Sequence, residues 1–311
     1  MHLLIPFASA MSDGCREVLK DMELPVLSRL LERMTAVSRN ESHEYSLSPP
    51  HERVLAELLG LAGADGALPW AAHWAARDGI ETGDLSWGLL TPAHWHVGTD
   101  HVTMLDPGRL ALDEAESRAL LEAVRHLFES EGWALVWGAP TRWYAAHESL
   151  TDLPTASPDR VIGRNVDLWM PDHPQARLLR RLQNEVQMLL YTHPLTEARL
   201  ARGALPVNSF WLSGCGPRQP ERPLEGWRVV WDLREASLNE DWLAWRETWQ
   251  RLDNEVLAPL AAALERAEPV TLVLCGERHA ARYEPRARSW TTRLVQRFAR
   301  PAPGTDVLLT L

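Results

Sequence analysis

The sequence predicts an α/β fold in which helices cover a mainly parallel sheet, with a small α+β domain inserted into it. Short continuous apolar runs at Leu3–Phe7 and Val270–Cys275 are typical of strands that are buried on both faces. Such runs alternate with amphipathic helical segments, a pattern that favours parallel pairing. Between residues 82 and 150 the pattern changes to several short strands around one helix. We therefore expect a core domain formed by 1–81 and 151–311, and an inserted domain at 82–150.

After the first strand, the core begins with helices. Ser12 or Asp13 can cap a helix, and prolines precede two further amphipathic segments. The predicted helices are Cys15–Met22, Val26–Met34, His51–Leu61 and Trp70–Ala76, with the stretch Gly60–Gly66 ending the third.

The segment 82–150 predicts a strand-rich domain. Its expected strands are Asp84–Leu90, Ala93–Val97, His101–Leu105, Trp133–Trp137 and Arg142–Ala145, around a helix from Leu112 to about Ser130. Gly98 tolerates a positive φ, so Val97–Asp100 reads as a tight hairpin turn.

The last third returns to long elements. Pro174–Leu190 predicts a helix, because five apolar side chains recur on one face, namely Ala176, Leu179, Leu182, Val186 and Leu190. Val207–Leu212 predicts a strand that ends at Ser213–Pro217, and Arg228–Asp232 predicts a buried strand. Asp241–Ala267 predicts a long helix with a stripe of Trp242, Trp245, Trp249, Leu252, Val256 and Leu260, and Asp306–Leu311 predicts a last strand.

Composition excludes several classes of function. The chain has 42 acidic and 32 basic residues, net charge −10, and an acidic chain repels nucleic-acid phosphates. No apolar run approaches the ~18 residues of a membrane span, so we expect no membrane partner. The three cysteines show no paired spacing, and the N-terminus lacks a basic leader, which together predict a cytoplasmic protein with reduced thiols.

Three segments carry a family resemblance. They are Leu24–Leu30; Gly83-Asp84 through Met104, Asp106, Asp113–Ala115 and Arg142; and His193-Pro194, Arg199, Gly203, Pro206–Asn208, Trp211 and Gly214–Gly216. Taken in order, they resemble the archaeal-type cofactor-independent phosphoglycerate mutases of the alkaline phosphatase superfamily. The whole chain is most similar to a proteobacterial group labelled phosphoglycerate mutase or RpfE-type regulatory protein. The resemblance implies an alkaline phosphatase-like core.

The resemblance also implies phosphoryl transfer by two divalent cations and a serine nucleophile, and this sequence departs from that pattern. Ala8-Ser9 stands where the first metal-binding Asp is expected, and His51-Glu52 stands where Ser-Asp is expected. Arg234–Ser237 and Gly276–His279 replace the later ligands, Gly88 replaces a substrate-binding Arg, and Arg142 alone is kept on the substrate side. Without such ligands the metals are not held. We therefore predict loss of mutase activity and no cofactor.

Other polar clusters remain candidates for binding. His94, His96 and His101 would lie on one hairpin face if Gly98-Thr99 is a two-residue turn, and three imidazoles suffice for zinc or manganese; the alternative is a polar face of hydrogen-bonded histidines. Arg160, Arg164 and Asn165 either hold a phosphate or carboxylate, or form a salt-bridged loop. His193, Arg199 and Asn208 follow the family pattern and are either ligand-binding or structural.

Three functions are open at this point. The first is a degenerate mutase-like protein that binds a phosphorylated small molecule or a protein partner and acts as a regulator. The second is a metal-dependent mutase or phosphatase whose ligands have moved to the three histidines and nearby carboxylates. The third is an interaction scaffold that docks a partner on the stripe from Trp242 to Trp249.

Overall fold

The computed structural model describes residues 1–174, 176–286 and 304–311, and these form two compact units. Unit 1 contains Met1–Glu44, Pro49–Leu55 and the described part of Pro223–Leu311, and unit 2 contains Tyr45–Ser48 and Ala56–Arg222. Unit 2 is therefore wider than the 82–150 insertion expected from the sequence. The reason is that a strand at residues 209–217 pairs along its length with one at residues 86–93.

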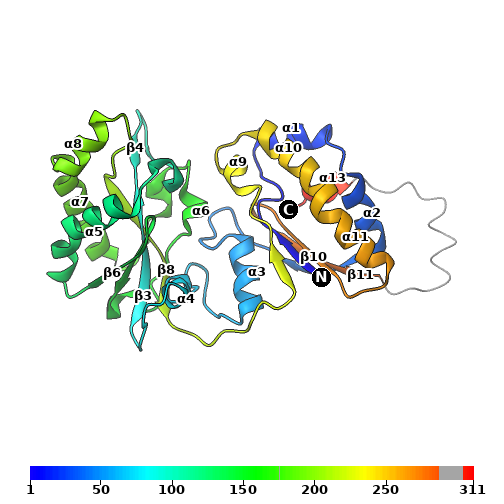
Figure 1. Cartoon of the computed structure of the whole chain (residues 1–311), viewed down its shortest axis with the longest axis horizontal. Helices are drawn as coiled ribbons and strands as arrows, with labels where there is room; N and C mark the ends of the chain where they lie inside the picture. The colour runs from blue at the N-terminus through cyan, green and yellow to red at the C-terminus, as the bar shows by residue number, and fades with distance from the viewer. Residues whose placement is uncertain (175, 287–303) are drawn as a thin grey trace. The chain divides into compact units, whose positions relative to one another are not determined.

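The sheet of unit 1 is mixed (Figure 1). Its order is β2 (Met34–Asn40), β11 (Ala280–Pro285), β10 (Thr271–Cys275), β1 (His2–Ile5) and β9 (Trp227–Val229). β1 is parallel to both β10 and β9, whereas β11 is antiparallel to β10 and to β2. The predicted α/β class is confirmed, but among the named strands of the described residues only β9, β1 and β10 pair in parallel. The strands β2 and β11 were not predicted from the sequence.

Helices cover one face of this sheet (Figure 1). They are α1 (Asp13–Lys20), α2 (Pro25–Arg33), α10 (Trp242–Leu252), α11 (Ala258–Glu265) and α13 (Gly304–Leu308), with the short α9 (Arg234–Leu238) after β9. Their apolar side chains share a core with Leu3, Ile5, Leu272 and Leu274 of the strands. The strand predicted at Asp306–Leu311 is wrong, since α13 occupies that region.

The predicted helix from Asp241 to Ala267 is interrupted by a π-helical turn at Asp253–Leu257. The turn places the buried Asp253 at the start of α2, where its carboxylate oxygens accept hydrogen bonds from the backbone amides of Val26 (3.0 Å) and Leu27 (2.8 Å). α2 has no cap from its own N-cap residue, Leu24. Asp253 therefore supplies that cap from a distant part of the chain.

The tryptophan stripe of α10 lies in the core of unit 1. Trp245 and Trp249 are fully buried, and their indole nitrogens donate to the carbonyls of Phe7 (3.0 Å) and Ala8 (3.1 Å). The stripe therefore anchors the segment that follows β1, and these two side chains are not a docking surface.

Unit 2 is built on an antiparallel sheet in the order β6 (Ala134–Ala139), β7 (Arg142–Ala146), β3 (Ser86–Ala93) and β8 (Ser209–Pro217). α4 (Trp70–Arg77) packs with one face, and α5 (Glu114–Glu129) and α7 (Ala176–Tyr191) pack with the other. The end of α3 (Pro50–Leu59), α8 (Pro194–Ala201), α6 (Pro158–Val161), the hairpin of β4 (Trp95–Val97) and β5 (Val102–Met104), and 3-10 turns at Pro107–Leu110, Glu148–Leu150 and Val166–Trp169 complete the unit.

The strand predicted to end at Leu212 continues to Pro217 as β8. The glycines do not stop the strand but let it pass close to α4: Gly214 has φ 64°, and a Cβ at that position would lie 2.8 Å from the Cβ of Trp70. The predicted stripe of α7 is confirmed, because all five of its apolar residues are buried.

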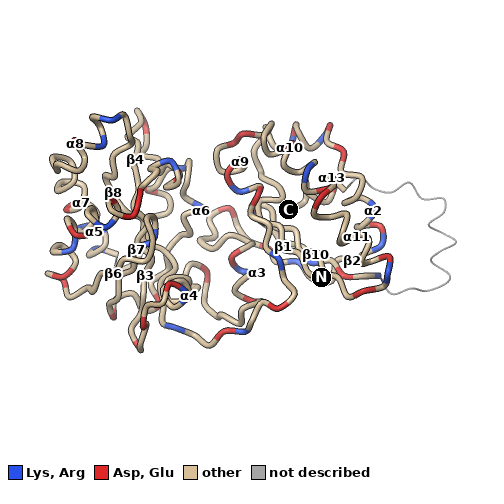
Figure 2. Tube along the Cα trace, in the orientation of Figure 1, with Lys and Arg blue, Asp and Glu red and all other residues tan. Residues whose placement is uncertain are grey.

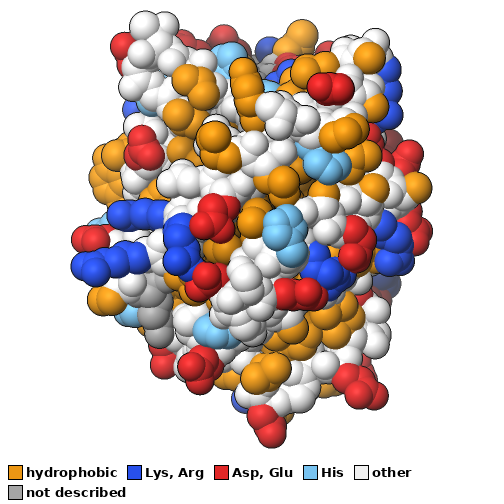
Figure 3. Space-filling view, turned by 90° about the vertical axis from the view of Figure 1, so that its left-hand side faces the viewer, with side chains coloured by type: hydrophobic (Ala, Val, Ile, Leu, Met, Phe, Trp, Pro, Cys, Tyr) orange, Lys and Arg blue, Asp and Glu red, His pale blue; other side chains and the backbone are white. Residues whose placement is uncertain are grey.

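The surface is mixed in character. Lys and Arg are interspersed with Asp and Glu in both units (Figure 2). The side of unit 2 formed by α5, α7 and α8 shows apolar side chains scattered among charged ones (Figure 3), and Met188 and Tyr191 on the outer face of α7 are exposed. Among the described helices, none is long and apolar enough to cross a membrane.

Candidate functional site

The carboxyl ends of β9, β1 and β10 meet at one edge of the unit 1 sheet, which is where open α/β sheets place ligands. The chain leaves β1 through Phe7, a non-glycine residue in the left-handed region at φ 57°. The amide of Ala8 then donates to the carbonyl of Cys275 (2.8 Å), which fixes the turn to the end of β10. Such strained backbone is common beside binding sites.

The first turn of α3 brings His51 to this edge. His51 is 2% exposed, and its ring centroid lies 4.8 Å from that of Phe7 and 5.5 Å from that of Trp231. Trp231 follows β9 by two residues and is 42% exposed. One imidazole is thus held between an aromatic ring from the end of β1 and one from the end of β9.

The end of β10 carries Glu277, Arg278 and His279. A carboxylate oxygen of Glu277 accepts from the amide of Met11 (2.8 Å), and Arg278 pairs with Glu44 (2.9 Å). Burial and then the positive charge of Arg39, with smaller effects of other arginines including Arg53, lower the pKa of His279, although Glu41 opposes them.

Arg53 is close enough to the end of β10 to act on two groups there. Burial raises the pKa of the Cys275 thiol, and the charge of Arg53 opposes that rise. The same guanidinium contributes to the lowered pKa of His279. Arg53 is therefore a positive charge at the carboxyl edge of the sheet.

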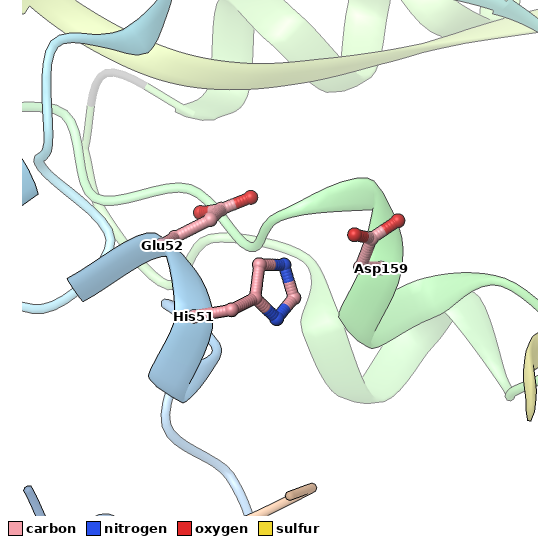
Figure 4. A group of neighbouring side chains, drawn as sticks. All are labelled: His51, Glu52 and Asp159. Atoms are coloured by element: carbon pink, nitrogen blue, oxygen red, sulfur yellow. The ribbon is translucent and has the colours of Figure 1, made fainter. Parts of the chain in front are cut away.

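Side chains of the types that ligate divalent cations occur on the first turn of α3 and on α6. His51 and Glu52 are consecutive on the first turn of α3 in unit 1, and Asp159 lies on α6 in unit 2 (Figure 4). Imidazole and carboxylate are both ligand types that zinc and manganese accept.

The predicted opposition of His96 and His101 is wrong. The β4–β5 loop contains four residues, closed by a hydrogen bond from the amide of Gly98 to the carbonyl of His101 (3.0 Å), so His96 pairs with Thr103. His94 instead places Nδ1 2.8 Å from the carbonyl of Pro206. Within the described chain, these three histidines do not form a group whose ligand atoms converge.

The candidates His193 and Asn208, which follow the pattern of the resembled family, make contacts within unit 2. His193 caps α8, its Nδ1 accepting from the amide of Leu195 (3.3 Å). The side chain of Asn208 accepts from the amide of Trp95 (2.7 Å) and donates to its carbonyl (2.9 Å). Both side chains therefore satisfy backbone groups at the start of an element, which is a structural role.

Arg199 is fully buried. Its guanidinium donates to the carbonyls of Leu205 (2.6 Å) and Leu110, and it pairs with Glu116, which also pairs with Arg202. Burial lowers the pKa of Arg199, while the charge of Glu116 opposes that shift. The Arg199 guanidinium therefore links α8 to α5, to the 3-10 turn at Pro107–Leu110 and to the segment at Leu205.

Arg142 binds the carboxylate of Asp78, a residue of this chain, and not that of a ligand. Its Nε and Nη2 donate to Asp78 (3.2 and 2.9 Å), and the Tyr144 hydroxyl donates to the same carboxylate (2.6 Å). Burial acts to raise the pKa of Asp78, but the hydrogen bonds from Arg142 and Tyr144 outweigh it and hold that pKa below its ordinary value.

The polar loop candidates stay within unit 2 as well. Asn165 caps a 3-10 turn by accepting from the amide of Asp167 (3.1 Å), and the Arg164 guanidinium lies 5.8 Å from the ring centroid of Trp169. Arg160 is buried and interacts with a neighbouring group. The two arginines and Asn165 thus belong to one segment of unit 2, as the sequence order implies.

Sequence reasoning missed Phe7, Arg53 and Trp231 as members of a site. Phe7 gives no signal, because nothing in the sequence shows its positive φ. Trp231 had been placed inside a buried strand, and the structure ends β9 at Val229. A strand predicted to end before Trp231 would have placed this indole at the carboxyl edge of the sheet.

No protein-family profile matches the chain. A curated relative, a probable 2,3-bisphosphoglycerate-independent phosphoglycerate mutase of Geobacter sulfurreducens, is 29% identical over 109 residues, which is 34% of this chain and 27% of the relative. The chain thus matches about a quarter of that relative's length. Among solved structures, a cofactor-independent phosphoglycerate mutase from Thermoplasma acidophilum is 14% identical, covering 91% of this chain and 89% of its own, with a TM-score of 0.38. The PH0037 protein from Pyrococcus horikoshii is 13% identical, covering 91% and 87%, with a TM-score of 0.40.

Proposed function

We propose that this chain is a phosphoglycerate mutase-like protein that lacks two-metal phosphoryl transfer and instead binds a small anionic metabolite at the carboxyl edge of the unit 1 sheet, as a regulatory protein. One observation carries the proposal. The turns after β1 and β10 offer one carboxylate, that of Glu277, which accepts a hydrogen bond from the Met11 amide, and one imidazole, that of His279. A pair of divalent cations needs several carboxylates and imidazoles, which these two turns do not provide.

The same edge has features that suit an anion. α3 begins there, and the amide dipoles of a helix N-terminus favour negative charge. Arg53, on that first turn, adds a full positive charge beside the end of β10. A phosphate or carboxylate is therefore the ligand group that this edge attracts.

Binding is tested by thermal unfolding with 3-phosphoglycerate and with inorganic phosphate. Ligand at a hundredfold excess over Kd stabilises the folded state by about 2.7 kcal/mol, which raises Tm by several degrees. We expect Arg53→Met to remove the shift and Arg118→Met, an exposed residue of α5 in unit 2, to leave it unchanged. Absence of any shift, or mutase turnover by the purified protein with manganese, overturns the proposal.

A second candidate is a metal-dependent mutase or phosphatase, favoured by the types of His51, Glu52 and Asp159. It predicts that metal analysis of untagged protein finds zinc or manganese, and that His51→Asn and Glu52→Gln lose it. Asp159→Asn, analysed alongside, reports whether unit 2 supplies a ligand. Metal-free protein that does not take up added manganese eliminates this candidate.

A protein partner is a separate proposal. The buried Trp245 and Trp249 do not serve it, so a partner would have to contact other residues of α10 or another surface. Co-elution of the purified chain with a defined partner would support it.

A further inference from the structure

We infer that the metabolite bound at the carboxyl edge of unit 1 carries a planar unsaturated ring that stacks on Trp231, in addition to its anionic group. The inference rests on the proposed function and specifies the class of ligand for the same edge. The residues that carry it are Trp231, His51 and Phe7.

The exposure of Trp231 is the first observation. Among the tryptophans in the described part of the chain, Trp231 alone is exposed, at 42% of its surface. Burying an aromatic side chain is favourable by a few kcal/mol, and this chain buries its other described tryptophans wholly or partly. An indole left open at the ligand-binding edge of a sheet is therefore a surface available for stacking.

The ring geometry is the second observation. Trp231 meets His51 at an interplanar angle of 89°, with centroids 5.5 Å apart. In an edge-to-face pair, His51 covers at most one face of the indole. Within the described residues, no other aromatic ring pairs with Trp231, so at least one indole face has no ring stacked on it.

The backbone around Trp231 is held on both sides. The amide of Val230 donates to the carbonyl of Leu4 (2.9 Å), and the carbonyl of Trp231 accepts from the amide of Arg234 (2.9 Å). The next residue, Asp232, pairs with Arg251 of α10 (3.0 Å). A fixed backbone reduces the ordering cost of stacking, because the indole is already positioned before the ligand arrives.

The ligand chemistry follows from the neighbouring charge. Arg53 lies two residues after His51 on the same helical turn, so one edge offers both an aromatic surface and a cation. A three-carbon phosphorylated acid would use only the cation. A nucleoside monophosphate has a planar base and a phosphate, and would use both.

The test compares adenosine monophosphate with ribose 5-phosphate, which share the sugar phosphate and differ in the base. Stacking of one base on an aromatic side chain is worth about 1–3 kcal/mol, so we expect adenosine monophosphate to bind roughly 5- to 150-fold more tightly in calorimetry. Trp231→Ala should make the two affinities equal, and Trp231→Phe should keep most of the difference. Leu243→Ala, which changes an exposed apolar residue of α10, is the matched control and should change neither affinity.

The outcomes separate the inference from the proposed function. If the two probes bind wild-type protein equally well, or if Trp231→Ala keeps the difference, the stacking inference is wrong while anion binding stands. If neither probe nor inorganic phosphate binds, both fail.

Discussion

Replacement of Arg199 tests whether the most deeply buried cation of unit 2 is structural, as its contacts indicate, or ligand-binding, as the family resemblance allowed. Arg199→Met keeps much of the side-chain volume and removes the charge. It leaves two backbone carbonyls, of Leu205 and Leu110, without their donor, and it leaves Glu116, which is 11% exposed, with one partner instead of two. Removing one partner of a buried ion pair costs about 3–5 kcal/mol.

The chain contains a matched control for this experiment. Arg202 pairs with the other oxygen of Glu116 but is 53% exposed, against 0% for Arg199. Exposed ion pairs contribute about 0–1 kcal/mol because water screens them and the side chains lose entropy. Arg202→Met should therefore cost at most about 1 kcal/mol.

Urea unfolding followed by circular dichroism measures both variants. A stability loss of ~3 kcal/mol or more for Arg199→Met, against ~1 or less for Arg202→Met, supports the structural role. Equal losses in the two variants would contradict the reasoning from burial. Wild-type stability of Arg199→Met together with lost phosphate binding would show that Arg199 is a ligand-binding residue.

Substitutions at three further positions test other parts of the structure. Asp253→Asn replaces one of the two oxygens that accept from α2 amides with a donor group, and should cost about 1–3 kcal/mol by urea unfolding. Burial raises the pKa of Asp253, although the two amide hydrogen bonds oppose the shift. The folded protein therefore holds the carboxyl proton of Asp253 more tightly than the unfolded chain does. The stability difference between wild type and Asp253→Asn should consequently fall as pH rises above about 3.9. Hydrogen bonds from Arg142 hold the pKa of Asp78 low, so the ionised carboxylate stabilises the folded protein by about 1–2 kcal/mol above pH ~3.9, and this contribution should disappear at lower pH. A stability difference between wild type and Asp78→Asn that grows in acid would contradict this. At Phe7, with φ 57°, glycine should be more stable than alanine by about 1 kcal/mol, the reverse of the usual order, and thermal unfolding of the two variants decides it.

The sequence predicted those elements whose residues repeat with a clear period. The stripe of α7 is an example, since Leu179, Leu182 and Val186 recur every three or four residues and are all buried. Elements fixed by distant contacts were not predictable. β8 was ended too early because its glycines resemble a turn, whereas Gly214 is required by the close approach of Trp70 from another element. The π turn at Asp253 likewise depends on a partner helix more than two hundred residues away.

The candidate site shows the same division. The hairpin of His96 was predicted, but not its register, since loop length moves the pairing by whole residues and so decides which side chains oppose one another. The residues at the carboxyl edge of unit 1 were noticed only as departures from a family pattern. Their arrangement depends on β1, β9, β10 and α3 meeting in space, which local sequence patterns do not encode.

The turn after β1 combines backbone strain with aromatic packing at that edge. Phe7 adopts a backbone conformation that costs an L-residue about 1–2 kcal/mol, and the indole nitrogens of Trp245 and Trp249 donate to the carbonyls of Phe7 and Ala8 in this turn. A glycine at position 7 would remove this strain without the loss of a hydrogen bond. The chain instead places an aromatic ring there, packed on His51. The rings of Phe7, His51 and Trp231 thus form one aromatic cluster. An aromatic ligand stacked on the exposed indole of Trp231 would extend this cluster by one ring.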